Sequence, residues 1–165
     1  YIGKIVWKVK KSSVHGSGVF ASKDIKKNTK IIEYIGEKIL KSEGDRRSEK
    51  RLKKYLNSSL TGSVYIFELN ARYDIDGSPY YNKARYINHS CNPNCEVDIE
   101  NEEIWIKSIK NIKKGEELTY DYGFGFDKDY RDFPCKCRSK NCVGYIVRSE
   151  SRWRIKKSRN LRSVR

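Results

Sequence analysis

The sequence predicts a mainly β fold of small twisted sheets with one surface helix. Three observations support this class: short runs of apolar and β-branched residues recur, turn-forming residues separate these runs, and one long polar segment has a helical pattern. The 165 residues are 37% hydrophobic and 35% charged, so we expect a small core rich in Ile, Val and Tyr. This length fits a single domain with appendages.

The expected strands are short runs rich in β-branched and aromatic residues. Asp76-Gly77 is a turn, an acidic tip joins two strands into a hairpin, and a short helix from Tyr81 leads toward Ile87. Asn57 to Ser63 is expected to be a flexible loop. The expected strands are Ile5 to Val9, Val19 to Ala21, Ile31 to Ile35, Val64 to Leu69, Tyr73 to Ile75, Cys95 to Ile99, Ile104 to Ile109, and Glu117 to Tyr122.

The segment from Ser42 to Leu56 is the best helix candidate. Ser42 and Asp45 have the spacing of a capping box, and Glu49 precedes Lys53 by four residues, which suits an ion pair on one helix face. A helix this polar lies on the surface. Its apolar stripe contains only Leu52, Tyr55 and Leu56.

The charge of the chain is unevenly distributed. The net charge of +15 favours polyanions such as nucleic acid or acidic protein surfaces. Yet 11 of the 21 acidic residues lie between Glu96 and Asp132, where six Lys or Arg occur. That segment could attract a basic ligand; the alternative is that Glu96 to Glu103 is simply a solvated hairpin tip. The tail from Arg148 to Arg165 has eight Arg or Lys and one Glu, and we expect that it cannot fold by burial alone.

No membrane partner is expected. No apolar run approaches the about 18 residues of a membrane span, and no segment has the pattern of a signal peptide. The chain has no Met and begins at Tyr1, which indicates a piece of a longer protein.

The five cysteines indicate a metal site or free thiols. Cys135, Cys137 and Cys142 have the spacing C-x-C-x4-C, which gathers three thiols and leaves tetrahedral zinc one ligand short. Cys91 and Cys95 are the candidates for the fourth ligand, and spacing alone does not choose between them. The alternative is unliganded thiols or disulfides, which the odd count and the missing secretory signal disfavour.

Three further motifs bear on the chemistry. The stretch from Arg85 to Cys95 places an amide, an imidazole and two thiols around an Asn-Pro turn. Alternation puts Tyr120 and Tyr122 on one strand face and Asp121 on the other, and such an aromatic slot suits a lysine side chain. The loop Ser13-Val14-His15-Gly16-Ser17-Gly18 can cradle a ligand through its backbone, although most such loops are turns.

Taken together, these motifs resemble the SET-domain lysine methyltransferases. The resemblance rests on Arg85-Tyr86-Ile87-Asn88-His89-Ser90-Cys91 and Glu117-Leu118-Thr119-Tyr120-Asp121-Tyr122. It extends from His15-Gly16-Ser17-Gly18-Val19-Phe20 and Glu33-Tyr34-Ile35-Gly36-Glu37 to the C-terminal cysteines. The cysteine spacing is similar to the post-SET segment of the trithorax and Set2 types.

The resemblance implies a β-clip SET fold with a pseudoknot and a division of the chain. Residues 1–126 would form the SET domain with a short N-terminal flank, including an insert at about 42–80. Residues 127–147 would form the zinc-bound post-SET segment, and residues 148–165 a basic tail.

The resemblance also implies the site residues. S-adenosylmethionine would be the methyl donor and one structural zinc ion the metal. Tyr122, Tyr120 and Tyr65 would form the catalytic lysine channel. The donor would be held by Gly16, Ser17, Gly18, Val19, Asn88, His89, Tyr122 and Tyr145. The zinc ligands would be Cys91, Cys135, Cys137 and Cys142.

The expected reaction is methylation of a lysine, mainly to monomethyl-lysine, on a histone tail. Tyr122 would orient the neutral amine, and its phenol, with a pKa near 10, is too weak a base at neutral pH to take the proton. Tyr120 carries a hydroxyl where extra methyl groups would turn. Expected partners are a histone tail or nucleosome, DNA through the basic tail, and activating subunits.

Two other classes remain as alternatives: a catalytically weak SET-like module that binds peptide or nucleic acid, and a zinc-stapled nucleic-acid binder. The intact set of Asn88, His89, Tyr120 and Tyr122 argues against the first, and the paired tyrosines are unexplained by the second. A histone-modifying enzyme would be nuclear, on chromatin. The Lys, Ile and Asn bias also fits a microbial protein exported to a host nucleus.

Overall fold

The computed structural model describes residues 5–56 and 64–155, and the chain divides into two compact units. One unit contains residues 1–29, 86–96 and 107–165, and the other contains residues 30–85 and 97–106. The predicted loop from Asn57 to Ser63 and residues 156–165 of the basic tail lie outside the described residues, as do the side chains of Tyr55 and Leu56.

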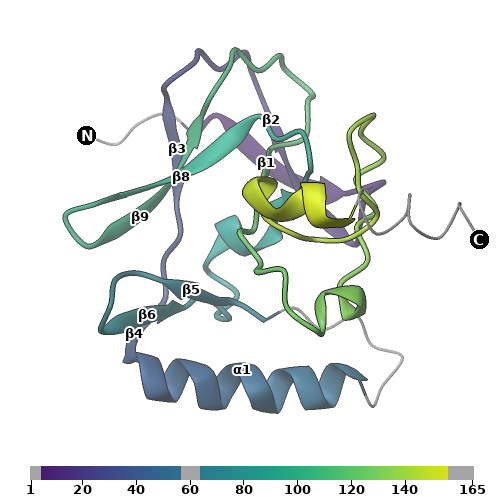
Figure 1. Cartoon of the computed structure of the whole chain (residues 1–165). Coiled ribbons are helices and arrows are strands. Elements are labelled where there is room, and N and C mark those ends of the chain that lie inside the picture. The colour runs from purple at the N-terminus through teal and green to yellow at the C-terminus, as the bar shows by residue number, and fades with distance from the viewer. Residues whose placement is uncertain (1–4, 57–63, 156–165) are drawn as a thin grey trace, which may run out of the picture. The chain divides into compact units, whose positions relative to one another are not determined.

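The mainly β prediction is confirmed, because the described strands form four small sheets (Figure 1). In the first unit β1 (Trp7–Lys11) and β2 (Ser17–Ala21) pair antiparallel, and β7 (Asn88–His89) and β10 (Thr119–Tyr120) pair in parallel. One three-stranded sheet has the order β4 (Glu37–Leu40), β6 (Tyr73–Asp76), β5 (Ile66–Glu68). The other has the order β3 (Lys30–Glu33), β9 (Glu103–Ser108), β8 (Cys95–Glu100).

Several predicted bounds differ from the structure. The first strand begins two residues later than expected, the strand expected at Val64 to Leu69 is shorter, and β4 was not predicted. The short helix near Tyr81 is the 3₁₀ helix η1 (Lys83–Tyr86). The two-residue strand β7 was also missed, because so short a strand has no periodicity. Its partner lies about thirty residues away along the chain, and only the fold brings them together.

The core of the first unit includes the buried side chains of β2. Val19 and Ala21 are fully buried, and Leu118 donates its amide to the Val19 carbonyl at 2.7 Å. Ile25 and Ile112 exchange two backbone hydrogen bonds of 2.8 Å, which join turns far apart in the sequence. The loop that contains Gly16, the strand that carries Asn88 and the strand that carries Tyr120 are thereby held on one scaffold.

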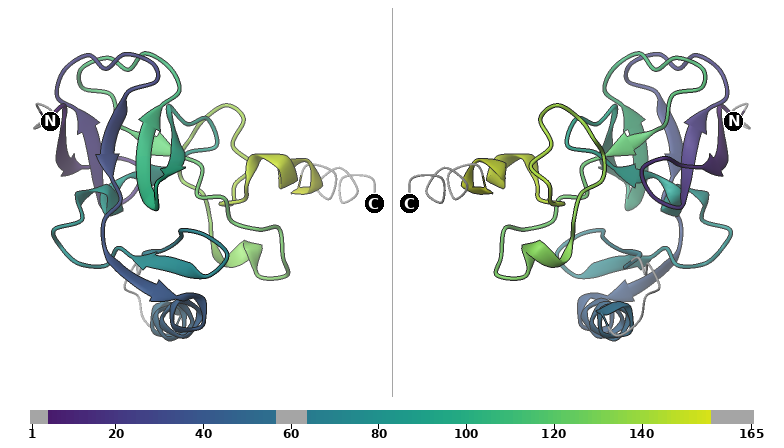
Figure 2. Two further views of the ribbon diagram at one scale, coloured as in Figure 1. Left: turned by 90° about the vertical axis from the view of Figure 1, so that its left-hand side faces the viewer. Right: turned by 90° about the vertical axis from the view of Figure 1, so that its right-hand side faces the viewer.

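The predicted helix exists as α1 (Lys41–Leu56), packed along the β4-β6-β5 sheet (Figure 2). It begins one residue before Ser42, so the predicted capping box is wrong. The predicted pair of Glu49 and Lys53 is present, with a distance of 2.8 Å. Gly44 lies against β6, where an added Cβ would lie 2.2 Å from Asp74 Oδ2. A side chain at this position would therefore push the helix away from the sheet.

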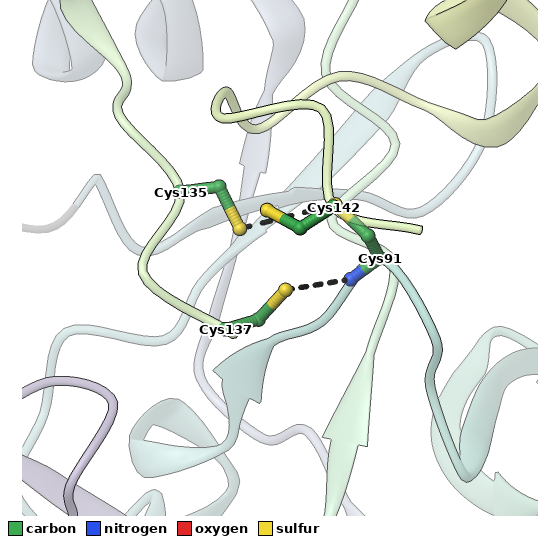
Figure 3. A group of neighbouring side chains, drawn as sticks. All are labelled: Cys91, Cys135, Cys137 and Cys142. Atoms are coloured by element: carbon green, nitrogen blue, oxygen red, sulfur yellow. Dashed lines mark hydrogen bonds between the residues drawn. The ribbon is translucent and has the colours of Figure 1, made fainter. Parts of the chain in front are cut away.

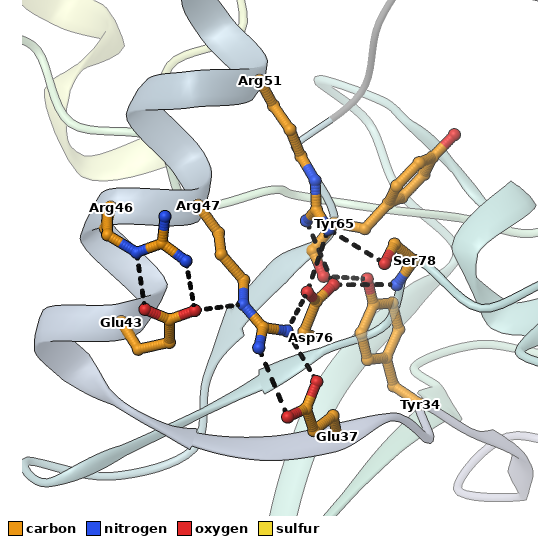
Figure 4. Close-up of polar contacts among 9 residues, drawn as sticks. All are labelled: Tyr34, Glu37, Glu43, Arg46, Arg47, Arg51, Tyr65, Asp76 and Ser78. Atoms are coloured by element: carbon orange, nitrogen blue, oxygen red, sulfur yellow. Dashed lines mark hydrogen bonds and ion pairs between the residues drawn. The ribbon is translucent and has the colours of Figure 1, made fainter.

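Ion pairs join α1 to the sheet (Figure 4). Asp76, with a side chain 3% exposed, accepts hydrogen bonds from Arg47 Nη1 at 2.8 Å and Arg51 Nη1 at 3.0 Å. Burial alone would raise the pKa of Asp76, but the bonds from both guanidinium groups outweigh burial and hold that pKa well below its ordinary value. Arg47 also binds Glu37 and Glu43.

Replacing Asp76 by asparagine is expected to destabilise the chain by about 1–3 kcal/mol at neutral pH, because two guanidinium groups lose their shared carboxylate. A pKa lowered by folding stabilises the native state above pH 4 and loses that contribution as pH falls through the folded pKa. The gap between Asp76→Asn and the unmodified chain should therefore narrow below about pH 4. Urea unfolding at several pH values measures this. Glu49→Gln is the control, whose exposed pair should contribute little at any pH.

The C-terminal segment is partly buried where the structure describes it. Between residues 148 and 155, the buried residues are Ser151, Arg152 and Ile155. Ile155, 1% exposed, joins a cluster with Tyr130, Val143 and Val147. Apolar burial by Ile155 therefore acts together with the hydrogen bonds of Arg152, which agrees with the expectation that this segment cannot fold by burial alone.

The acidic hairpin is largely neutralised within the chain. Glu100 pairs with Lys30, Glu102 Oε1 lies 3.0 Å from Lys38 Nζ, and Glu96 Oε1 lies 3.8 Å from Lys107 Nζ. These contacts favour the interpretation of a solvated hairpin tip over a dedicated site for a basic ligand. Among the described residues, no helix has the length and apolar character to cross a membrane.

Candidate functional site

The candidate site is built where two distant segments of the first unit cross. β7 lies parallel to β10, with Asn88 opposite Thr119 and His89 opposite Tyr120. Asn94 fastens the crossing: its Nδ2 donates to the Glu117 carbonyl at 2.8 Å, and its Oδ1 accepts from the Thr119 amide at 2.9 Å. The crossing thus places an asparagine and a histidine beside a tyrosine strand.

Asn88 connects this crossing to the glycine loop. Its side-chain amide donates to Glu117 Oε1 at 2.7 Å and to the Ser17 carbonyl at 3.1 Å, with the His15 carbonyl at 3.4 Å. Ser12 Oγ donates to the same carboxylate at 2.8 Å. Glu117 therefore joins both parts of the site.

Sequence reasoning missed Glu117 and Ser12 as site residues. Gly18 is the sequence feature connected with Glu117. An added Cβ at Gly18 would lie 2.3 Å from Glu117 Oε1, so the glycine leaves room for the carboxylate. Gly16 has a φ of +49°, and its carbonyl accepts from the Ser12 amide at 2.9 Å. The loop thereby turns back sharply, with Gly16 and Ser17 exposed and Gly18 and Val19 buried.

His89 lies between the crossing and the tyrosines. It is 4% exposed, and its Nδ1 accepts from the Tyr122 amide at 3.2 Å, so the neutral ring carries its proton on Nε2. Its ring centroid lies 5.3 Å from that of Tyr122. The imidazole thus fixes the backbone and ring of Tyr122 from one side.

Tyr120 and Tyr122 form an aromatic pair, as the strand alternation predicts. Their ring centroids lie 4.9 Å apart, and Tyr120 is 8% exposed. The Tyr122 hydroxyl donates to the Ile87 carbonyl at 2.8 Å, which fixes the phenol oxygen against the threaded segment. Phe124 extends the group, with its ring 5.8 Å from that of Tyr122. The three rings form an aromatic wall in which the Ile87 carbonyl orients the Tyr122 hydroxyl.

Four cysteines gather in the same unit (Figure 3). The Sγ atoms of Cys91, Cys135, Cys137 and Cys142 lie within 4.8 Å of one another, and no other such group of potential metal ligands occurs among the described residues. Zinc–sulfur bonds of about 2.3 Å in a tetrahedron place sulfurs about 3.8 Å apart. The Sγ atoms of Cys91 and Cys135 are 3.9 Å apart. The four thiols therefore fit a structural zinc ion.

The protonation of Cys91 differs sharply from that of Cys95. The hydrogen bond with Cys135 lowers the pKa of Cys91 to about 3, despite its burial, and raises the pKa of Cys135. Burial raises the pKa of Cys95 to about 12. Cys95 donates to its neighbour Asn94 at 3.5 Å and lies outside the cluster. Because the Cys91 Sγ lies within 4.8 Å of the other three Sγ atoms, Cys91 suits the fourth position and Cys95 does not.

The remaining predicted site residues are Tyr65 and Tyr145. Tyr65 belongs to the second unit, where its carbonyl accepts from the Tyr34 hydroxyl at 3.0 Å and the Arg85 guanidinium lies 3.9 Å above its ring. Tyr145 is in the first unit, and its ring packs edge-on against Tyr130 at 5.0 Å. The roles that the resemblance gives them stay predictions.

Comparison with known proteins identifies the family. The SET-domain family model matches residues 16–123, a span that contains the glycine loop, the threaded segment and the tyrosine strand. The chain belongs to the SET-domain family. Its curated relatives are far longer, so the chain corresponds to a small part of each.

Three relatives illustrate the similarity. Histone-lysine N-methyltransferase 2D of Homo sapiens is 40% identical over 136 residues, which are 80% of this chain and 2% of the relative. The H3 lysine-4 specific histone-lysine N-methyltransferase of Aspergillus oryzae is 38% identical over 141 residues, 82% of this chain and 11% of the relative. Histone-lysine N-methyltransferase trr of Drosophila melanogaster is 40% identical over 136 residues, 80% of this chain and 5% of the relative.

Proposed function

We propose that this SET-domain chain is a protein-lysine N-methyltransferase that transfers a methyl group from S-adenosylmethionine to a lysine of a histone tail. The observation that carries this proposal is the crossing of β7 and β10, which holds Asn88 and His89 beside the Tyr120–Tyr122 pair. Relatives named as histone-lysine N-methyltransferases support the reaction class.

The donor would lie against the glycine loop and the threaded segment. The exposed backbone of Gly16 and Ser17 leaves room for a ligand, since an added Cβ at Gly16 would meet nothing within 4 Å. Asn88 and His89 would contact the donor from β7, with Gly18 and Val19 holding the loop and Tyr145 covering the adenine. Bound S-adenosylmethionine supplies an electrophilic methyl on a positively charged sulfonium.

The lysine must reach this methyl as a neutral amine. Its ordinary pKa of about 10.4 keeps it charged in water, and a water-poor aromatic wall lowers that pKa by disfavouring the ammonium ion. The amine proton leaves to solvent before alignment. A bound donor would supply its methyl to the amine lone pair, and the electrons of the S–C bond would stay with the departing sulfur. Tyr122 would orient the amine through its hydroxyl, and Tyr120 would line the channel beside it.

The zinc ion is assigned to Cys91, Cys135, Cys137 and Cys142. Backbone amides support the thiolates, because Cys91 N donates to Cys137 Sγ and Gly144 N donates to Cys142 Sγ, both at 3.4 Å. The ion would join the post-SET segment to the threaded segment through Cys91. Its role is structural, since four protein ligands leave no open position for a substrate.

The substrate proposed is the tail of histone H3. One relative is named for lysine 4 of that histone, and the similarity covers 82% of this chain. We place the protein on chromatin in the nucleus, with the nucleosome as partner. Contacts of the basic tail with DNA and activation by further subunits are secondary parts of this proposal.

A methyl-transfer assay tests the function directly. The chain is incubated with labelled S-adenosylmethionine and a histone H3 tail peptide, alongside a peptide in which lysine 4 is replaced by arginine. Transfer to the first peptide and not the second supports the reaction and the site. Transfer to both peptides would show that a lysine other than lysine 4 accepts the methyl group. No transfer to either peptide or to nucleosomes refutes the enzyme and favours a binding module.

The product of the reaction is expected to be mainly monomethyl-lysine, because the Tyr120 hydroxyl occupies space where a methylated amine must turn. Tyr120→Phe should raise the share of dimethyl- and trimethyl-lysine severalfold while monomethylation continues. Mass spectrometry of the peptide measures the three products over time. Equal rates of monomethylation and trimethylation by the unmodified chain would show that Tyr120 does not limit the product.

A further inference from the structure

Arg152 is a buried arginine in the basic C-terminal segment, which the sequence predicts cannot fold by burial alone. The residue is 9% exposed, although its neighbours Trp153 and Arg154 are exposed. Burial of a guanidinium costs free energy unless each of its nitrogens donates a hydrogen bond to an acceptor. In this chain all three nitrogens do so, which makes Arg152 the junction of three segments.

The three acceptors belong to different parts of the first unit. Arg152 Nε donates to the Val147 carbonyl at 2.8 Å, within the C-terminal segment itself. Its Nη1 donates to the Cys91 carbonyl at 2.7 Å, and its Nη2 donates to Asp121 Oδ2 at 2.5 Å. Only a planar fork with five N–H groups reaches all three directions at once.

The contact with Cys91 reaches the metal cluster from outside its cysteine run. Cys91 is the one member of the cluster that precedes residue 135, so it alone joins the cluster to the threaded segment. Its carbonyl also accepts from Asn141 Nδ2 at 3.0 Å. Two donors thus fix the backbone that presents the Cys91 thiol.

The contact with Asp121 reaches the tyrosine strand. Asp121 lies between Tyr120 and Tyr122, and its Oδ2 also accepts from the Ser149 amide at 3.0 Å. Its Oδ1 accepts from the Gly123 amide at 3.1 Å and lies 3.8 Å from His89 Nδ1. A shift of this carboxylate would move the backbone that carries both tyrosines.

We propose that Arg152 is a positioning residue that locks the loop of Cys91 to the tyrosine strand, so that metal retention and methyl transfer depend on the same guanidinium. This rests on the proposed function for its catalytic half. Arg152 touches no reacting atom. It acts through the Cys91 backbone and the Asp121 carboxylate, and it gives residues 148–155 a role in the active enzyme.

The test compares Arg152→Met with Arg154→Met, which removes the same charge from an exposed neighbour. Zinc release to a colorimetric chelator is followed at fixed pH, together with kcat and KM for the histone H3 peptide. We expect Arg152→Met to release zinc about tenfold faster and to lower kcat about tenfold with little change in peptide KM, the loss of one to two charge-assisted hydrogen bonds. Arg154→Met should match the unmodified chain.

Two further variants separate positioning from simple loss of structure. Arg152→Lys keeps the charge and the apolar stem but reaches fewer acceptors, so it should fold as judged by circular dichroism and show a partial defect in both readouts. Asp121→Asn combined with Arg152→Met should show a smaller joint effect on kcat than the product of the two single effects, because both break one contact.

The outcomes are distinguishable. Arg152→Met and Arg152→Lys both behaving like Arg154→Met in zinc release and kcat would overturn the proposal. A raised peptide KM with unchanged kcat would also overturn it, since that pattern indicates weakened substrate binding rather than misplaced tyrosines. If the unmodified chain transfers no methyl, the proposed function fails, and zinc release alone still decides whether Arg152 fastens Cys91.

Discussion

Tyr122→Phe is expected to lower kcat for methylation of the histone H3 peptide by about a hundredfold or more, the loss seen when one preorganised polar group is removed from an active site. The hydroxyl is fixed at 2.8 Å from the Ile87 carbonyl, and the ring is packed between Tyr120 and His89. The variant removes the Tyr122 hydroxyl and keeps the ring that packs against Tyr120 and His89. The fold should therefore remain while the amine loses its orientation.

Single-turnover rates with saturating donor and peptide measure this effect. Tyr73→Phe is the matched control, because Tyr73 lies in β6 of the second unit and its ring is covered by Lys38. It should retain the rate of the unmodified chain. A Tyr122→Phe variant with near-normal kcat would show that packing alone aligns the amine and that the hydroxyl is dispensable.

Cys91→Ala is expected to abolish stoichiometric zinc binding and to reduce methyl transfer by about a hundredfold or more. A structural zinc ion with three remaining thiolates loses a large part of its binding free energy, and the released ion no longer holds the post-SET segment. The change also removes the thiol that faces His89 Nε2 at 3.7 Å. Metal content by mass spectrometry and transfer rates are measured on the same preparation.

Cys95→Ala is the matched control for this prediction. Cys95 is also buried, lies in the same threaded region and is excluded from the cluster. Its loss should cost stability through a small cavity, with one zinc ion per chain retained and the reaction intact. Loss of zinc from Cys95→Ala together with retention by Cys91→Ala would reverse the ligand assignment.

Local patterns carried much of the fold and of the site. Alternating β-branched runs gave most strands, and the polar run before Asn57 gave α1, because these signals depend on near neighbours in sequence. The spacing of Cys135, Cys137 and Cys142 predicted a cluster for the same reason. The motifs around Asn88 and Tyr120 predicted the SET-domain family, to which the chain belongs.

Other features depend on contacts that no local pattern records. The strand β7 exists only because β10 lies beside it, and Glu117 gains its role from Ser12, Asn88 and the space above Gly18. The sequence did not predict that Asp76 holds α1, because Arg47 and Arg51 belong to a polar helix whose charges are expected to be solvated. Each case depends on which distant groups meet, and this decides whether a charge is solvated or paired.

By itself the sequence determined a mainly β SET-domain chain with a threaded asparagine and histidine, a tyrosine pair and a three-thiol run. The cysteine spacing left Cys91 and Cys95 open and the family resemblance implied Cys91; the tertiary structure gathers Cys91 with those thiols and leaves Cys95 outside the cluster. It also decided that Arg152 is buried rather than solvated. The sequence does not distinguish a buried arginine from a solvated one. The difference is whether acceptors from distant segments lie within hydrogen-bond reach of the guanidinium.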